Sequence, residues 1–242
     1  MNNHQKLTEK QIGKVFSTSL VIRGNTWLPL TEIIVWLIMT FVDHRRHPNR
    51  SAASHVSTGA LTTFVILVSE WVHNLAHAAA ARLVGKPMDY MRIQWGMPRC
   101  IYKNIHDLSV TPREHILRSM GGPLINAFSL PFWLFFKRSA YPESTALDVA
   151  EAGLAMNTFL STFSLLPIPG IDGGPILKWG LVSRGIAPHK ADDLVLQMNR
   201  FTAIGLTAAS ALLFKKKVWL PSAVCALMAV ISWLVGYKVI KE

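Results

Sequence analysis

The chain has 242 residues, of which 50% are hydrophobic and 16% are charged. Soluble domains carry about 25% charged residues, so this composition indicates an α-helical integral membrane protein. The formal net charge is +11, and the basic residues lie mostly in the N-terminal tail and at the ends of apolar runs, as in chains that face anionic headgroups. Nucleic acid is therefore not expected as a partner, because nucleic-acid-binding proteins gather basic residues on a polar domain.

The cysteines and the N-terminus limit the class further. Cys100 and Cys225 lie in apolar surroundings and form no CxxC pair, so we expect free thiols rather than a disulfide framework. Residues 1–26 are polar and basic and lack the apolar core and cleavage site of a signal peptide. We expect a tail or a short amphipathic surface helix there, followed by a single membrane domain over residues 27–242.

Apolar runs dominate the rest of the chain, and a membrane helix needs about 20 apolar residues. Gly85 and Pro87 end the second run, and Pro112 lies at the start of the helix that holds the third. Residues 188–200 are amphipathic and are predicted to lie on the membrane surface. Basic residues flank the runs on both sides, which leaves the orientation open. We expect about six membrane segments, over residues 27–42, 57–84, 116–136, 147–166, 201–214 and 218–240.

Residues 88–104 interrupt this helical pattern. Apolar and polar residues alternate over residues 90–95, a turn follows at Gly96, and residues 99–102 can form a return strand. The pattern predicts a small β-hairpin or sheet at the membrane. Its edge could pair with an extended peptide. An ordinary interfacial loop is an equally good explanation of the same residues.

Three ionisable side chains lie inside the second apolar run: Glu70, His73 and His77. At 100° per residue they fall within about 60° of one another on one helix face. Two histidines at i and i+4 can bind a single metal ion. Ionisable groups at membrane depth are costly and are therefore functional candidates. A hydrogen-bond site between helices remains the alternative.

Two further polar residues interrupt apolar runs. Asn126 follows a small-residue stretch that allows close helix approach, so it needs a polar partner. Asp172 lies in residues 166–175, whose prolines and glycines prevent a regular helix. Irregular backbone at membrane depth persists only where it is buried in protein or lines a cavity. Two histidines and this aspartate would make a three-ligand zinc site with an open fourth position.

The motifs that carry these residues resemble those of the site-2 protease family of intramembrane zinc metalloproteases. Residues 73–77 resemble the family's HExxH helix, residues 122–126 its GPxxN helix, and residues 164–174 its NxxPxxxLDGG motif. The three motifs run in the family's order. The resemblance implies a three-helix core over about residues 57–180.

The resemblance also implies roles for individual residues. His73, His77 and Asp172 would bind Zn²⁺, and residues 88–109 would form the sheet that receives an extended substrate. The partners would be the lipid bilayer and a transmembrane or membrane-proximal peptide, and the protein would be a multi-pass protein of a prokaryotic cell membrane. Four residues would lie near the substrate: Gly122, Pro123, Asn126 and Ser164.

Two positions depart from the family's pattern. Asn74 replaces the glutamate of HExxH, which takes a proton from the attacking water and later gives it to the leaving amine. An amide cannot carry that proton, and loss of such a base typically costs about 10²–10⁴ in rate. Ser164 replaces an asparagine, which affects substrate positioning.

Glu70 is the candidate substitute for the missing base. It lies on the same helix face as His73, about 4.5 Å away along the axis. It could orient the His73 ring, ligate the metal, or act as the base, and we expect these roles in that order.

The sequence therefore predicts a site-2-protease-like intramembrane zinc metallopeptidase, with weak or absent activity because of Asn74. A catalytically inactive pseudoprotease, which binds metal and membrane peptides as a regulator or scaffold, is the main alternative. A metal or proton transporter is a third class, and it rests only on the polar cluster.

Overall fold

The computed structural model describes residues 9–104 and 107–237. The chain divides into two compact units. Unit 1 comprises the residues up to Leu108 together with Gly121–Ser161, and unit 2 comprises Ser109–Met120 together with the residues from Thr162 onward. The single membrane domain expected over residues 27–242 stays a prediction, because these units are defined by packing and not by a bilayer.

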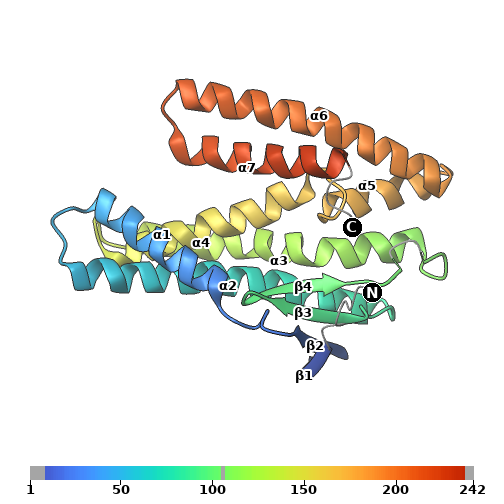
Figure 1. Cartoon of the computed structure of the whole chain (residues 1–242), viewed down its shortest axis with the longest axis horizontal. Helices are drawn as coiled ribbons and strands as arrows, with labels where there is room; N and C mark the ends of the chain where they lie inside the picture. The colour runs from blue at the N-terminus through green and yellow to red at the C-terminus, as the bar shows by residue number, and fades with distance from the viewer. Residues whose placement is uncertain (1–8, 105–106, 238–242) are drawn as a thin grey trace, which may run out of the picture. The chain divides into compact units, whose positions relative to one another are not determined.

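Unit 1 contains a four-stranded sheet of order β1-β2-β3-β4 (Figure 1). The central pair β2–β3 is parallel and the two outer pairs are antiparallel. The strands are β1 (Glu9–Val15), β2 (Thr18–Arg23), β3 (Tyr90–Gln94) and β4 (Met97–Ile101). The β-hairpin expected within residues 88–104 is confirmed as β3 and β4.

The N-terminal segment differs from its prediction. Residues 9–23 form β1 and β2, so the expectation of a tail or surface helix was wrong there. The reason is the short apolar and β-branched run of β2, which suits a half-buried strand. Leu20 packs against a buried cluster of Ala78, Met88 and Met91. The apolar side chains of β2 thus determine the structure of a segment that also carries Lys10, Lys14 and Arg23.

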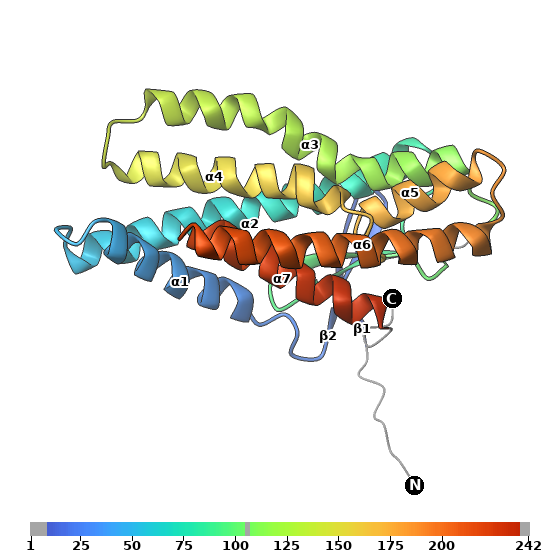
Figure 2. The ribbon, with the colours of Figure 1, turned by 90° about the horizontal axis from the view of Figure 1, so that it is seen from above.

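Four helices complete unit 1. Helices α1 and α2 form an antiparallel pair, and α4 lies beside the part of α3 that belongs to this unit (Figure 2). Trp71 and Leu75 of α2 pack with Ala78 on the sheet cluster, so the sheet is fixed against the helix that carries the histidine pair. The bounds are α1 (Leu30–Arg46), α2 (Ala52–Leu83), α3 (Pro112–Ser139) and α4 (Thr145–Thr162).

Unit 2 consists mainly of a long helical hairpin. Its elements are the 3₁₀-helix η1 (Phe163–Leu165) and the helices α5 (Gly173–Val182), α6 (Pro188–Lys215) and α7 (Trp219–Gly236). The expected surface helix and the expected fifth membrane segment are a single helix, α6, because residues 188–214 contain no helix-breaking proline after the first position. Asn199 bonds Ser232 and Ser210 bonds Ser222 across the hairpin.

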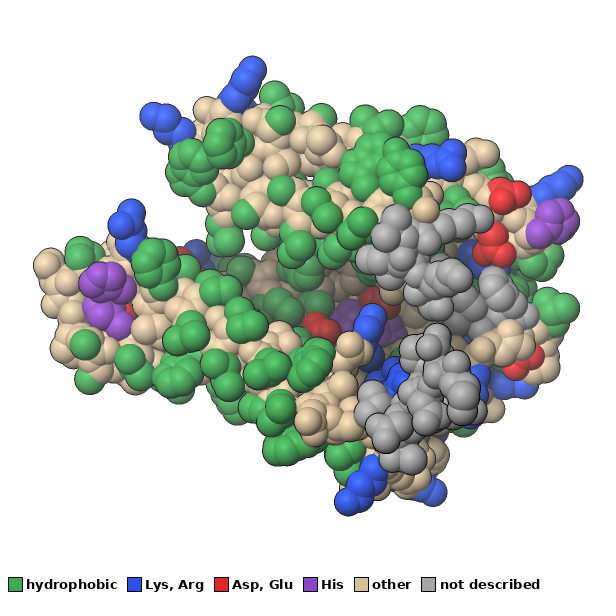
Figure 3. All heavy atoms as spheres, viewed as in Figure 1, with side chains coloured by type: hydrophobic (Ala, Val, Ile, Leu, Met, Phe, Trp, Pro, Cys, Tyr) green, Lys and Arg blue, Asp and Glu red, His purple; other side chains and the backbone are tan. Residues whose placement is uncertain are grey.

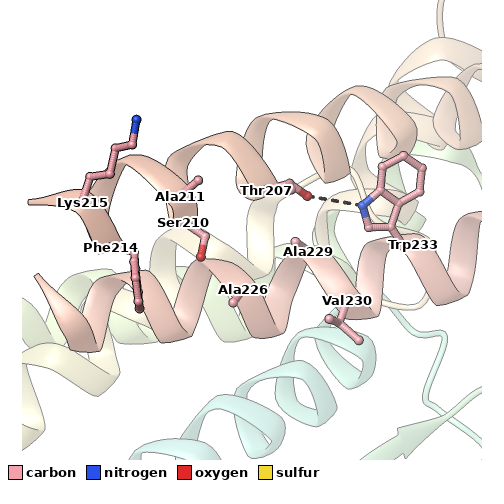
Figure 4. Close-up of a pocket in the computed structure, with 9 residues that line it drawn as sticks. All are labelled: Thr207, Ser210, Ala211, Phe214, Lys215, Ala226, Ala229, Val230 and Trp233. Atoms are coloured by element: carbon pink, nitrogen blue, oxygen red, sulfur yellow. Dashed lines mark hydrogen bonds between the residues drawn. The ribbon is translucent and has the colours of Figure 1, made fainter. Parts of the chain in front are cut away.

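An open groove of about 630 Å³ follows this hairpin (Figure 4). Small side chains form its floor, and the indole N–H of Trp233 donates to Thr207 Oγ1 at 3.3 Å at one end. The groove is lined by Thr207, Ser210, Ala211, Phe214, Lys215, Ala226, Ala229, Val230 and Trp233.

Membrane character is visible in helix composition. Among the residues that the structure describes, α2 and α7 are long and apolar enough to cross a membrane. Four more expected segments coincide with α1, α3, α4 and α6 but do not meet that criterion, so the number of six membrane segments stays a prediction. Exposed hydrophobic side chains are spread over the visible surface of each unit (Figure 3).

Candidate metal centre

The centre of unit 1 is the histidine pair of α2. His73 and His77 are both buried, and their Nε2 atoms lie 3.1 Å apart. Their rings meet edge to face at 80° with centroids 4.7 Å apart. Zinc–nitrogen bonds measure about 2.0–2.1 Å, so one ion can bond both nitrogens at this separation. The helical spacing i, i+4 thus produces a convergent nitrogen pair, as the sequence predicted.

Gly122 of α3 leaves the space that such an ion needs. A Cβ added at Gly122 would lie 2.5 Å from His73 Cε1 and 2.6 Å from His73 Nε2, and it would also collide with His77 Nε2. The neighbouring Gly121 faces the backbone of α2, where an added Cβ would lie 2.6 Å from the carbonyl oxygen of Ala76. The glycine pair therefore lets α3 approach α2 closely, and Gly122 places no side chain beside the ring nitrogens. The residues present fit a zinc ion at this point.

Asn126 of α3 fixes the His73 ring. Its Oδ1 atom lies 2.7 Å from His73 Nδ1, and its Nδ2 group donates to Asn157 Oδ1 at 2.7 Å. Asn126 is 1% exposed. With Nδ1–H donating to the amide oxygen, the lone pair of His73 is on Nε2, where a metal would bind. The expected polar partner of Asn126 is therefore the histidine itself. Pro123, one turn earlier, is fully buried in the same helix.

Asn74, at the position of the family's glutamate, is held in place by its neighbours. Its Nδ2 group donates to Glu70 Oε1 at 3.1 Å and to the Glu70 backbone oxygen at 3.0 Å. The thiol of Cys100, on β4, donates to Asn74 Oδ1 at 3.3 Å. Both N–H groups of the amide are thus directed to Glu70. Asn74 links the carboxylate on α2 to strand β4.

The remaining predicted residues belong to unit 2. Ser164 is buried in η1, and Asp172 directly precedes α5. Gly173 allows the tight turn there, because an added Cβ would collide with the backbone oxygens of Leu165 and Leu166. The structure therefore brings Glu70, His73, Asn74, Gly122 and Asn126 together with His77 in unit 1. The assignment of Asp172 as a ligand and of Ser164 to substrate binding stays a prediction.

Unit 1 holds a second group of possible metal ligands, away from the histidine pair. One donor atom each of Asp43, His47 and Asp148 lies within 4.8 Å of the others. Arg50 already bridges the two carboxylates, with Nη1 at 2.5 Å from Asp43 Oδ1 and 2.7 Å from Asp148 Oδ2. His55 bonds the other oxygen of Asp43 at 2.5 Å. A guanidinium thus occupies the position between the carboxylates that a cation would take.

Asn157 and Cys100 were not predicted as site residues. Asn157 is a buried amide within an apolar helix, which is the same signal that drew attention to Asn126. Cys100 was judged only as a thiol in an apolar stretch, and its contact with Asn74 depends on strand β4 packing beside α2. The sequence pattern alone could have identified Asn157 but not Cys100.

Comparison with known proteins gives a consistent result. No family model matches the chain. A protein from Methanocaldococcus jannaschii that carries the provisional name of a zinc metalloprotease is 29% identical over 124 residues, or 44% of this chain. The match spans 63% of the length of that relative.

A solved structure shares the fold. The site-2 protease from Methanocaldococcus jannaschii aligns over 97% of both chains with a TM-score of 0.54 and 14% sequence identity. The three motifs follow the family's order. The chain therefore has the fold of a site-2 protease and is similar in sequence to a protein named as a zinc metalloprotease.

Proposed function

We propose that the chain is a zinc-binding, multi-pass membrane protein that acts as a site-2-type metallopeptidase with weak hydrolytic activity. Its substrate would be a transmembrane or membrane-proximal peptide, and its location a prokaryotic cell membrane with about six membrane segments. The observation that carries the proposal is the pair of imidazole Nε2 atoms, 3.1 Å apart beside Gly122. Two histidine nitrogens in this arrangement are suited to zinc.

Three residues would hold the ion: His73, His77 and Asp172. Support for Asp172 comes from its place in the third motif and from its position at the start of α5, where a carboxylate is available. When bound, zinc would supply a Lewis acid that polarises the scissile carbonyl and lowers the pKa of water. Asn126 would keep His73 in the tautomer that presents Nε2.

Strand β4 would bind the peptide. It is the edge of the sheet, and an edge strand offers free backbone groups to an extended chain. Cys100 on this strand contacts Asn74 one residue after His73, so a peptide paired with β4 would run past the histidine pair. Ser164 would contribute to the same substrate site.

A second candidate, a catalytically inactive peptide-binding relative, is favoured by the contacts of Asn74. The family's base would have to accept a proton, whereas this amide directs both N–H groups to Glu70. Glu70 is then the one carboxylate on α2 that could move a proton near the histidine pair. The two candidates differ only in whether Glu70 does so.

The test uses the purified full-length protein in detergent or liposomes. Zinc content should be close to one ion per chain and should be lost in His73→Ala and in Asp172→Ala. It should be kept in His189→Ala, which changes a histidine of α6 in unit 2. A wild-type protein without zinc after reconstitution would contradict the proposal.

Cleavage of a membrane-peptide library separates the two candidates. Weak cleavage by the wild type that disappears in Glu70→Gln supports a peptidase with a relocated base. Cleavage only by a variant carrying Asn74→Glu supports the inactive relative.

A further inference from the structure

A chain of buried amides continues from the histidine pair into α4. His73 Nδ1 bonds Asn126 Oδ1, and Asn126 Nδ2 donates to Asn157 Oδ1, each at 2.7 Å. Asn157 in turn donates to Ser69 Oγ at 2.9 Å and to the Gly153 backbone oxygen at 2.8 Å. Because Ser69 belongs to α2, the chain starts and ends on the helix that carries both histidines.

We propose that Asn157 is a positioning residue for the metal centre, acting through Asn126 to fix the tautomer and ring orientation of His73. This role deepens the proposed function and rests on it only for the identity of the ion. Asn157 lies on α4. Its effect passes through one hydrogen bond to Asn126.

The reason is that the two ends of an amide side chain differ, because the oxygen accepts hydrogen bonds and the nitrogen donates them. The Asn126 side chain can rotate so that either its oxygen or its nitrogen faces His73. Asn157 Oδ1 is an acceptor and pairs only with the Nδ2 end, which leaves Oδ1 for the ring. His73 must then carry its proton on Nδ1, and the lone pair on Nε2 faces His77 Nε2.

The orientation of Asn157 is itself determined. Its Nδ2 group has two acceptors, Ser69 Oγ and the Gly153 oxygen, and Ser129 Oγ donates to its Oδ1 at 2.7 Å. A flipped amide would place its oxygen against the Gly153 carbonyl oxygen and its nitrogen against Asn126 Nδ2, an acceptor pair and a donor pair that cannot bond. Asn157 is 3% exposed, so water does not compete for these bonds.

Burial makes the arrangement costly to disturb. With an apolar residue at 157, Asn126 Nδ2 would lose its acceptor inside the helix bundle, and both amide orientations would become accessible. In the flipped orientation the amide nitrogen would face His73 Nδ1 and favour the tautomer with its proton on Nε2. That tautomer cannot bind a metal through Nε2 without first moving the proton.

The experiment compares metal affinity in three variants of the full-length protein. Cobalt(II) serves as the probe, because its absorption spectrum reports ligand geometry, and zinc competes for it. Asn157→Leu removes the acceptor, and Asn157→Asp keeps an acceptor for Asn126. Asn199→Leu is the matched control, because Asn199 is an equally buried amide that bonds Ser232 in unit 2.

Asn157→Leu should weaken cobalt affinity about tenfold, the lower end of the range for groups that orient metal-binding histidines. Asn157→Asp should stay close to the wild type, and so should Asn199→Leu. Equal affinity of Asn157→Leu and wild type would overturn the proposal. An equal loss in Asn157→Leu and Asn199→Leu would overturn it as well, since it would reflect general destabilisation.

A second measurement does not depend on metal. Nitrogen-15 spectra of histidine-labelled protein without metal distinguish the two imidazole tautomers, and a His73→Gln variant assigns the His73 signals. The wild type should show a proton on His73 Nδ1, and Asn157→Leu should show a mixture. A wild type that binds no metal would refute the proposed zinc function alone. An unchanged His73 tautomer in Asn157→Leu would refute the positioning role alone.

Discussion

Asn74 does more than replace the glutamate that serves as the base in the HExxH motif. Asn74 supplies donors to the Glu70 carboxylate and accepts a bond from Cys100. A glutamate at this position would set two carboxylates one helical turn apart and would remove the bond from Asn74 Nδ2 to Glu70 Oε1. Like charges at i, i+4 repel each other, and the loss of a buried partner adds to that cost. The substitution is therefore structurally coupled to Glu70.

This coupling predicts the behaviour of a restored motif. Asn74→Glu should lower the free energy of unfolding by about 1–3 kcal/mol, because it replaces a hydrogen bond to a charged group by repulsion between two carboxylates. The double variant Glu70→Gln with Asn74→Glu should recover most of this loss, because the amide and the carboxylate simply exchange places. Thermal unfolding in detergent measures both. A single variant as stable as the wild type would refute the coupling.

Gly122 gives a second prediction at this scale. Gly122→Ala should reduce cobalt and zinc affinity at least about tenfold, because the methyl group would collide with both ring nitrogens. Gly205→Ala is the control, since a Cβ there meets nothing within 4 Å. That change should leave metal affinity alone and stabilise α6 by about 0.5–1 kcal/mol. Undiminished affinity in Gly122→Ala would show that the ion binds elsewhere.

Individual residues were predictable to different degrees. Glu70, His73 and His77 were expected on one face because helical periodicity fixes that geometry, and on α2 the structure bonds Asn74 to Glu70 and His73 to His77. Contacts between distant segments were not predictable. The bond from Cys100 to Asn74 and the bond from Asn126 to Asn157 depend on how β4, α3 and α4 pack around α2.

At the level of elements, the turn between β3 and β4 determines how the edge strand is held. Trp95 and Gly96 have φ values of 56° and 88°, which is the left-handed pair of a two-residue hairpin. The carboxylate of Glu32, at the start of α1, packs directly on Gly96. Backbone bonds from Trp95 N to the Thr26 oxygen and from Thr31 N to the Trp95 oxygen add to this contact. These contacts hold the β3–β4 hairpin, which would receive a peptide, against the start of α1.

Gly96→Ala should therefore destabilise the hairpin for two reasons. Left-handed backbone costs a non-glycine residue about 1–2 kcal/mol, and the methyl group would displace Glu32. The double variant Glu32→Ala with Gly96→Ala should recover the steric part and keep the backbone part. Hydrogen exchange of the β3 and β4 amides reports the local loss. Exchange unchanged from the wild type would contradict this account.

Elements were predicted well where the hydrophobic period of the sequence agreed with the positions of glycines and prolines at the ends of elements. The hairpin at 88–104 follows from the alternation of apolar and polar residues and from the turn at Gly96. Strands β1 and β2 were missed because their basic residues obscured an apolar alternation, and because β2 pairs with β3 about 70 residues later. Sheet partners this far apart in the chain leave little local signal.

For the whole molecule, membrane insertion is the main prediction. α2 and α7 are apolar enough to span a bilayer, and large apolar side chains are exposed along α1, α3 and α6. We expect the expressed protein to stay in the membrane fraction through an alkaline carbonate wash and to dissolve only in detergent. Release by the wash would contradict a spanning arrangement.

The ionic group around Arg50 has a consequence for any metal titration. Asp43 and Asp148 are already ion-paired with this guanidinium, whose Nη2 donates to the Glu143 backbone oxygen. Displacing it would leave a cation whose side chain is only 15% exposed without its two carboxylates, which typically costs several kcal/mol. Arg50 therefore already supplies the positive charge that a metal ion would bring to Asp43 and Asp148. A binding isotherm should saturate at a single equivalent, and a second equivalent should emerge only when Arg50 is exchanged for a neutral residue such as methionine.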